Sequence, residues 1–157
     1  MTNDLSFALP DGRFNYRVGA IIIHDGKLLM VKGSAPYFYT VGGRVALHES
    51  TEQSLVREIF EETGIKCEVE QLAFVNEVFF TLASSGEQFH ELAFFFVIKP
   101  NDAFGAIANG QTLGDDAETH FAWLPLDRLR EHDLYPLFFK EKLQNLGDGI
   151  LHIVERD

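Results

Sequence analysis

The sequence predicts a fold that combines helices and strands (α/β or α+β), with a mixed β-sheet at its centre. Two observations support this prediction. Seven short runs are apolar or rich in aromatic residues, as strands are, whereas residues 51–63 repeat their apolar side chains at the helical period. The chain has 157 residues, of which 46% are hydrophobic and 24% are charged, and this suits one globular domain with its own core.

The seven strand-like runs are expected to build the sheet. They span residues 15–23, 27–32, 37–41, 68–80, 88–99, 120–125 and 150–154. His24, Asp25 and Gly26 lie between the first two runs, and the glycine can adopt the positive φ that a tight hairpin needs. Ser84, Ser85 and Gly86 separate the two longest runs, which predicts an antiparallel hairpin.

The helix over residues 51–63 has recognisable signals at both ends. Ser50 is expected to cap its N-terminus, with Gln53 three residues later as the partner in a capping box. Gly64 stands where a left-handed residue closes many helices. These signals predict a helix that begins and ends at defined residues.

The chain is expected to form a single domain over residues 1–157, because no repeat, low-complexity tract or linker divides it. The first 13 residues are expected to be a loosely packed lead-in. A short helical turn is expected at Pro125 or Leu126, and a second helix over residues 136–146, which carries proline near its start.

Charge and cysteine content restrict the partners and the compartment. The net charge of -11 at pH 7 argues against a nucleic-acid groove or an anionic membrane surface as partner. Cys67 is the only cysteine, so no disulfide forms within the chain, which fits a reducing compartment. The first ten residues lack the features of a signal peptide, and no run approaches the ~18 apolar residues that a membrane span needs. We therefore expect a cytoplasmic protein.

The helix over residues 51–63 carries an acidic face beside its apolar face. Glu58, Glu61 and Glu62 share roughly 100° of arc on a helical wheel. Glu58 and Glu62 are four residues apart, a spacing at which like charges repel, and Arg57 supplies only part of the counter-charge. A hard divalent cation such as Mg²⁺ or Mn²⁺ would supply the rest. On periodicity alone, a solvated acidic face is the more common explanation.

A glycine pair precedes this helix. Gly42 and Gly43 let a backbone come close to a ligand, and the loop that follows ends at Glu49. A glycine loop beside a carboxylate-lined helix suits a diphosphate held through metal ions.

The spacing of these residues resembles the Nudix box, G-x5-E-x7-R-E-U-x-E-E-x-G-U, in which U is bulky and apolar. Every fixed position is matched, by Gly43, Glu49, Arg57, Glu58, Ile59, Glu61, Glu62, Gly64 and Ile65. A chance match is on the order of 10⁻⁹ per window at typical residue frequencies. The chain is thus similar to MutT-like Nudix hydrolases, and the flanking strand pattern extends the resemblance over most of residues 16–126.

The resemblance implies the Nudix fold, an α/β/α sandwich around a mixed sheet. It also implies Mg²⁺- or Mn²⁺-dependent hydrolysis of a nucleoside diphosphate linked to another group, X. By position, Glu58 and Glu62 look like the principal metal ligands, with the carbonyl of Gly42 as a further ligand. Glu61 looks like another ligand or like the group that activates the attacking water. Glu58 could also activate this water.

Two residues of the box and one outside it have supporting roles in the family. Arg57 resembles the arginine that holds the glutamates, and Glu49 the residue that braces the loop. Many members add an acidic ligand before a Trp strand; Glu118, ahead of Trp123, is the candidate here, and a solvated acidic loop is the open alternative. Val41 departs from the proline that often precedes the glycine pair.

Substrate contacts are expected outside the carboxylate cluster. Arg44 and Gly43 could meet a phosphate or X, as could Arg17 on the first strand, although a surface salt bridge would explain either arginine equally well. Glu77 and His90 lie among phenylalanines on the two longest runs, where a base could stack. For His90, a hydrogen-bonded core histidine is the more common explanation.

The predicted function is pyrophosphohydrolysis of a small soluble nucleotide. The alternative is a catalytically inactive Nudix-fold module that senses nucleotides or binds a protein. A homodimer is plausible, as in many relatives. The identity of X is expected to depend on loops outside the box, such as residues 103–118.

Overall fold

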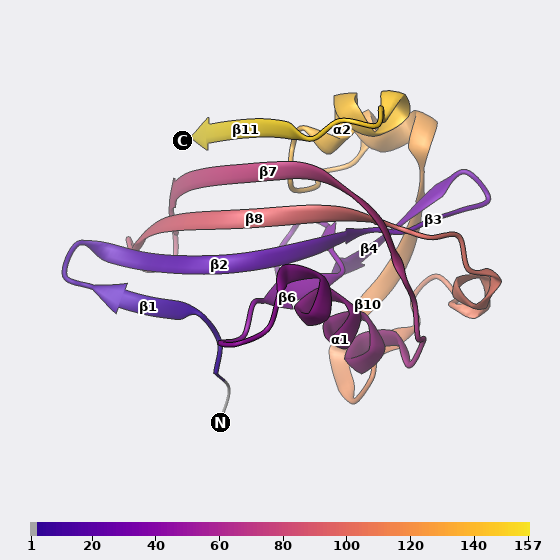
Figure 1. The fold of residues 1–157 in the computed structure, drawn as a ribbon, viewed down its shortest axis with the longest axis horizontal. Coiled ribbons are helices and arrows are strands. Elements are labelled where there is room, and N and C mark those ends of the chain that lie inside the picture. The colour runs from indigo at the N-terminus through magenta and orange to yellow at the C-terminus, as the bar shows by residue number, and fades with distance from the viewer. Residues whose placement is uncertain (1–2) are drawn as a thin grey trace.

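Two β-sheets form the frame of the protein, and the computed structural model describes them over residues 3–157 (Figure 1). The six-stranded sheet has the order β1 (Ser6–Leu9), β2 (Gly12–Ile21), β8 (Gln88–Ile98), β7 (Val69–Thr81) and β11 (Leu151–Arg156), with β6 (Gly42–Arg44) also paired to β2. The five-stranded sheet has the order β3 (Ile23–His24), β4 (Lys27–Lys32), β10 (Asp116–Pro125) and β9 (Thr112–Leu113), with β5 (Tyr39–Thr40) paired to β4.

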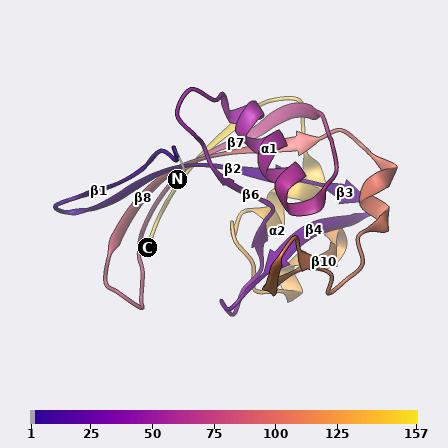
Figure 2. The ribbon, with the colours of Figure 1, turned by 90° about the horizontal axis from the view of Figure 1, so that it is seen from below.

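The larger sheet is mixed, as predicted. Strands β2 and β8 are parallel, as are β7 and β11, whereas β7 and β8 form the expected antiparallel hairpin. The far ends of β1, β2, β7 and β8 extend beyond the part of the sheet that α1 (Thr51–Thr63) covers (Figure 2). The sheet therefore offers both a covered half and an extended half.

Short helices complete the fold. Besides α1 they are α2 (Phe139–Lys142) and the 3-10 turns η1 (Asp102–Ala106), η2 (Leu126–Glu131) and η3 (Leu143–Asn145). Turn η2 begins at one of the two residues predicted for a helical turn. None of the helices within residues 3–157 has the length and apolar character needed to span a membrane.

Helix α1 begins and ends where its capping signals predict. The Ser50 side chain accepts a hydrogen bond from the Gln53 amide at 3.1 Å, and the Gln53 side chain accepts one from the Ser50 amide at 2.9 Å. Gly64 adopts a left-handed conformation with φ of 74°, and its amide donates to the Phe60 carbonyl at 2.8 Å. The caps satisfy backbone groups that a helix leaves free at its ends.

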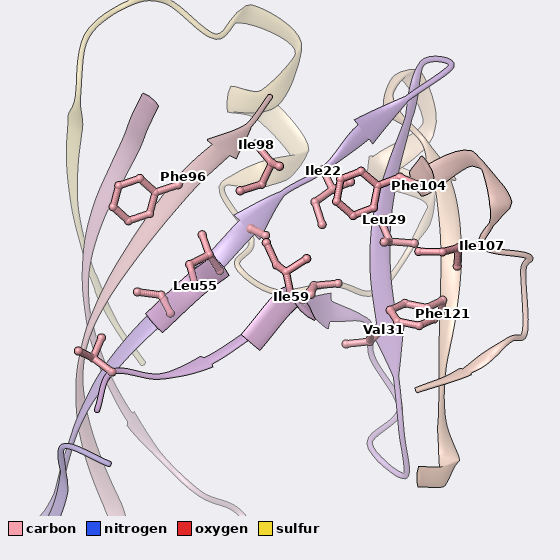
Figure 3. Close-up of a cluster of buried hydrophobic side chains, with 14 residues drawn as sticks. Ile22, Leu29, Val31, Leu55, Ile59, Phe96, Ile98, Phe104, Ile107 and Phe121 are labelled. Carbon is pink, nitrogen blue, oxygen red and sulfur yellow. The ribbon is translucent and has the colours of Figure 1, made fainter. Parts of the chain in front are cut away.

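Two apolar clusters occupy opposite faces of the larger sheet. The α1 cluster, most of which Figure 3 labels, comprises Val18, Ala20, Ile22, Leu29, Val31, Val41, Val45, Leu55, Ile59, Phe96, Ile98, Phe104, Ile107 and Phe121. The α2 cluster comprises Ile21, Leu28, Met30, Ala73, Phe74, Ala93, Phe95, Leu124, Leu129, Leu134, Phe139 and Leu143. Consecutive residues of β2 alternate between the clusters, which defines an α1 face and an α2 face of the sheet.

The expected loose lead-in over residues 1–13 is wrong for most of its length. Residues 6–9 form β1, which pairs antiparallel with β2 from Gly12 onward. Phe7 and Leu9 keep 48% and 64% of their surface exposed, so backbone hydrogen bonds rather than side-chain burial hold the strand. Met1 and Thr2 lie outside the described residues.

Two predicted strands are each divided between the two sheets. Residues 15–23 leave the larger sheet at Ile22 and continue as β3 in the smaller one. Within residues 37–41, only Tyr39–Thr40 form a strand, β5 in the smaller sheet, and the buried Val41 then leads into β6 of the larger one. A change of sheet leaves the apolar pattern uninterrupted, so sequence periodicity did not reveal it.

The second predicted helix, residues 136–146, is much shorter than expected. Only residues 139–142 are α-helical, and a 3-10 turn follows over residues 143–145. Phe139 and Leu143 are the buried residues of this part, and they lie one turn apart. A single buried pair stabilises a single turn, because helices in proteins depend on tertiary packing of one face.

Candidate active site

The acidic face of α1 lies against the glycines of β6. A Cβ atom placed on Gly43 would lie only 2.4 Å from Cδ of Glu58, so the Glu58 carboxylate occupies the space that any larger residue would fill. A Cβ atom on Gly42 would lie 2.1 Å from the Val18 carbonyl oxygen. The glycine pair thus lets β6 fit between β2 and α1.

Arg57 connects the loop to the glutamates of α1. Its Nε donates to both carboxylate oxygens of Glu49 at 3.1 Å, and its Nη1 donates to Glu58 at 3.0 Å and to Glu61 at 3.4 Å. Burial lowers the pKa of Arg57, but hydrogen bonds to Glu49 and Glu58 outweigh it and raise the pKa above its ordinary value. The guanidinium therefore stays charged and fixes three carboxylates at once.

Glu49 ties the loop to the helix through a second partner. Ser54 Oγ donates to Glu49 Oε2 at 2.8 Å. This hydrogen bond, together with those from Arg57, lowers the pKa of Glu49 although burial opposes the change. Glu49 is consequently held as a carboxylate at the end of the loop.

Glu62 is the most strongly perturbed carboxylate. Burial, and then the negative charges of Glu58 and Glu61, raise its pKa to about 8, and Arg17 offsets part of this rise. Its Oε2 atom is buried and has no hydrogen-bond partner within residues 3–157. Burial also raises the pKa of Glu58, although Arg57 opposes it. A buried oxygen without a partner is costly, and a bound cation would relieve that cost.

The donor chemistry at this face fits a hard divalent cation. Glu58, Glu61 and Glu62 supply carboxylate oxygens, and Glu62 has a free buried oxygen. Within residues 3–157, however, no group of three or more His, Cys, Asp or Glu side chains already converges as a metal site. Two of these carboxylates, Glu58 and Glu61, are hydrogen-bonded to Arg57 instead.

Two arginines lie side by side next to this face. Arg17 on β2 and Arg44 on β6 are cross-strand partners, and Arg17 is close enough to Glu62 to lower its pKa. The Nε atom of Arg44 is buried without a hydrogen-bond partner, and neither arginine forms an ion pair within the described part of the chain. Like charges directly opposite each other destabilise a sheet, so an anion bound here would be stabilising.

Tyr39 is a neighbour of Glu62 that the sequence did not single out for the site. Burial raises its pKa, as do the charges of Glu62 and Asp116, whereas a hydrogen bond with Thr119 and the charge of Arg17 lower it. No local signal identifies Tyr39, because its polar neighbours come from three separate segments.

Glu118 lies at the start of β10 with its side chain exposed, rather than in a loop. Its backbone amide donates to Asp116 Oδ1 at 2.9 Å. Gly114, in the turn between β9 and β10, comes closer to α1. A Cβ atom on Gly114 would lie 3.7 Å from the Glu61 carbonyl oxygen.

Glu77 and His90 lie on the α1 face, but in the extended half of the sheet. Glu77 forms a 2.6 Å hydrogen bond with His152, and His90 packs against the rings of Phe14 and Phe79 in an open groove. His90 is exposed, so the expectation of a core histidine is wrong. Within residues 3–157, neither residue forms a hydrogen bond or ion pair with the carboxylates of α1.

Comparison with known proteins identifies the family. A family model for the NUDIX domain matches residues 13–143. A MutT-like protein from Streptomyces ambofaciens is 36% identical over 58 residues, which is 36% of this chain and 38% of that protein. The chain therefore matches less than half of that relative's length.

Solved structures of similar fold come from several organisms. The ORF135 protein of E. coli is 24% identical with a TM-score of 0.54, over 85% of this chain and 89% of that one. A NUDIX hydrolase from Nitrosomonas europaea is 27% identical with a TM-score of 0.52, over 75% and 76%. A MutT protein from Bacillus halodurans is 16% identical with a TM-score of 0.61, over 90% and 89%. Since the family model matches most of the chain and includes its acidic helix, the protein belongs to the NUDIX domain family.

Proposed function

We propose that the protein hydrolyses a phosphoanhydride bond in a nucleoside diphosphate linked to a group X, with Mg²⁺ or Mn²⁺ as cofactor. The observation that carries the proposal is Glu62, whose buried oxygen has no partner among the described residues, beside Glu58 and the glycines of β6. A small nucleotide is the proposed partner rather than nucleic acid, because the net charge is -11.

Four groups would hold the metal. They are the carboxylates of Glu58, Glu61 and Glu62 and the carbonyl of Gly42. When bound, the metal would neutralise charge on the diphosphate and help a water molecule to lose its proton. Glu118 is a weaker candidate, because its side chain is exposed and forms no hydrogen bond or ion pair with α1 within residues 3–157.

The remaining residues would position the substrate and the water. Arg57 holds Glu58, while Glu61 is more exposed than Glu58, at 55% against 17%, so Glu61 can reach a water molecule and accept its proton. Arg17 and Arg44 would bind the diphosphate from the other side, because guanidinium groups match phosphate oxygens.

An activity panel with matched variants tests this proposal. Nucleoside triphosphates, sugar nucleotides and dinucleotides would be incubated with Mg²⁺, with Mn²⁺ and with EDTA. We expect hydrolysis only with metal, and a loss of about 100-fold or more in Glu61→Gln and Glu62→Gln. Glu52→Gln is the control, since Glu52 is exposed in the first turn of the same helix.

Two results would reject the mechanism: turnover that survives EDTA, or turnover that survives both substitutions. The alternative, a module that binds nucleotides without hydrolysing them, predicts tight binding by calorimetry with no product after hours.

A further inference from the structure

We propose that a polar stripe on the α2 face of the larger sheet recognises X, and that X is a hydroxyl-rich group such as a sugar. The polar stripe consists of Asn15, Glu91, Asn76 and Glu155. This inference rests on the proposed function, because it assigns the substrate class of the same site.

The strand register brings the stripe together from four strands. Asn15 on β2 is the cross-strand partner of Glu91 on β8. Val78 on β7 pairs with both Glu91 and Glu155, so the two glutamates flank one valine. In the neighbouring row, Ala93 pairs with both Arg17 and Asn76. By strand alternation all of these residues share one face of the sheet.

Each asparagine of the stripe orients one carboxylate. Asn15 and Asn76 are each only 1% exposed, and their amide groups donate to Glu91 Oε2 at 2.8 Å and to Glu155 Oε1 at 3.0 Å. The second oxygen of each carboxylate has no hydrogen-bond partner within residues 3–157, and both glutamates are partly exposed. The stripe therefore presents two fixed acceptor oxygens that a ligand can reach.

Arg17 connects the stripe to the catalytic side. Its cross-strand partner on one side is Arg44, which follows the Gly43 against which the Glu58 carboxylate lies, and its partner on the other side is Ala93. Neighbouring strands lie about 4.8 Å apart, so the distance from β2 across β8 to β7 is about 10 Å, comparable to a sugar ring with its hydroxyls. A diphosphate bound by the arginine pair would place X beside the stripe, one row along the strands from Arg17.

The carboxylates of the stripe favour ligand groups that donate hydrogen bonds. An ionised carboxylate only accepts hydrogen bonds, so it pairs with hydroxyl groups and repels the terminal phosphate of a nucleoside triphosphate. We therefore expect a nucleoside diphosphate sugar to be a better substrate than the triphosphate with the same base.

Competition between two substrates of one base tests the stripe. The ratio of kcat/KM for UDP-glucose to that for UTP, and for ADP-ribose to ATP, would be measured for the protein and for Glu91→Gln. Glutamine keeps an oxygen that can accept from Asn15 but loses the charge. We expect this ratio to fall about 10-fold or more in the variant. Glu70→Gln, on an exposed position of β7, is the control and should keep the ratio.

Several outcomes would overturn the inference. One is a preference for triphosphates, and another is an equal loss on both substrates in Glu91→Gln, which indicates a purely structural stripe. A strong preference for UDP-glucosamine over UDP-glucose would assign the stripe to a cationic X instead. If nothing is hydrolysed, the proposed function fails, and calorimetry that compares the binding of UDP-glucose with that of UDP then tests the stripe alone. Tighter binding of UDP-glucose than of UDP, with this difference reduced in Glu91→Gln, supports the stripe. Equal binding of the two ligands overturns it.

Discussion

At the scale of single residues, the site depends on close packing between charged and very small groups. The Glu58 carboxylate lies against Gly43 because that glycine has no side chain. Glu62 is partly buried, with one carboxylate oxygen fully enclosed, and lies near two like charges, so its neutral form is favoured in the absence of a cation. Both features make the site sensitive to the loss or gain of a few atoms.

Replacing Gly43 by alanine should reduce turnover about 100-fold. The new Cβ atom would lie 2.4 Å from Glu58 Cδ and displace the carboxylate, and a misplacement of about 1 Å can cost this much. The measurement is kcat with Mg²⁺. Gly147→Ala is the control, since a Cβ atom there would have no neighbour within 4 Å. Full activity in Gly43→Ala would show that the position of Glu58 is unimportant.

The pH dependence of stability should report on Glu62. Its folded pKa of about 8 lies above the ordinary value of 4.5, so the folded state binds more protons than the unfolded state between these values. The Glu62 contribution to stability is therefore present below pH 4.5 and is lost as pH rises through 8. In EDTA, Glu62→Gln should be increasingly more stable than the parent protein from pH 5 to pH 8, as measured by urea unfolding. A pH-independent difference would contradict the assignment.

At the scale of elements, α1 is the part that the sequence specifies most completely. Its caps, its apolar residues and its glutamates all lie within residues 50–64. Each feature depends on neighbours no more than four residues away, so helix geometry alone relates them. The helix can thus present its carboxylates in one arrangement whatever the distant parts of the chain do.

Removal of the N-cap should weaken α1 measurably. Ser50→Ala loses the hydrogen bond to the Gln53 amide, and such caps contribute about 1 kcal/mol. We expect the free energy of unfolding to fall by about that amount in urea titrations. Ser84→Ala, in the exposed turn between β7 and β8, should change it by less than about 0.5 kcal/mol. Equal effects of the two substitutions would indicate that the capping box adds nothing.

At the scale of the whole molecule, two sheets share one chain that passes between them at Ile22 and at Val41. The α1 cluster and the α2 cluster fill the space on either side of the larger sheet. In the α2 cluster, Phe139 is fully buried and contacts the rings of Phe74 and Phe95. The short helix that carries Phe139 is therefore a fixed part of the core.

Truncation of Phe139 should destabilise the whole fold. Phe139→Ala would leave a cavity beside Phe74 and Phe95, and substitutions of this kind cost about 3–5 kcal/mol. Leu137→Ala is the control, because Leu137 is an exposed neighbour two residues away. Urea unfolding of both variants gives the comparison, and a loss below about 1 kcal/mol in Phe139→Ala would contradict the packing.

The sequence alone predicted the mixed fold, the limits of α1 and the family, because these depend on local periodicity and on a motif of 23 residues. It did not predict β1, a strand of only four residues whose apolar side chains stay exposed, or the changes of sheet at Ile22 and Val41.

The sequence by itself determined that three glutamates and Arg57 share one helical face behind a glycine pair, since a helix fixes the relation of residues three and four apart. Only the tertiary structure decided that Arg17 comes close enough to Glu62 to lower its pKa and that Asn15 meets Glu91, 76 residues away. The tertiary structure likewise separated Glu77 and His90, which lie among the phenylalanines of β7 and β8, from the carboxylates of α1. The physical reason is strand register: which residues face each other across a sheet depends on contacts between distant segments, and no short stretch of sequence contains that information.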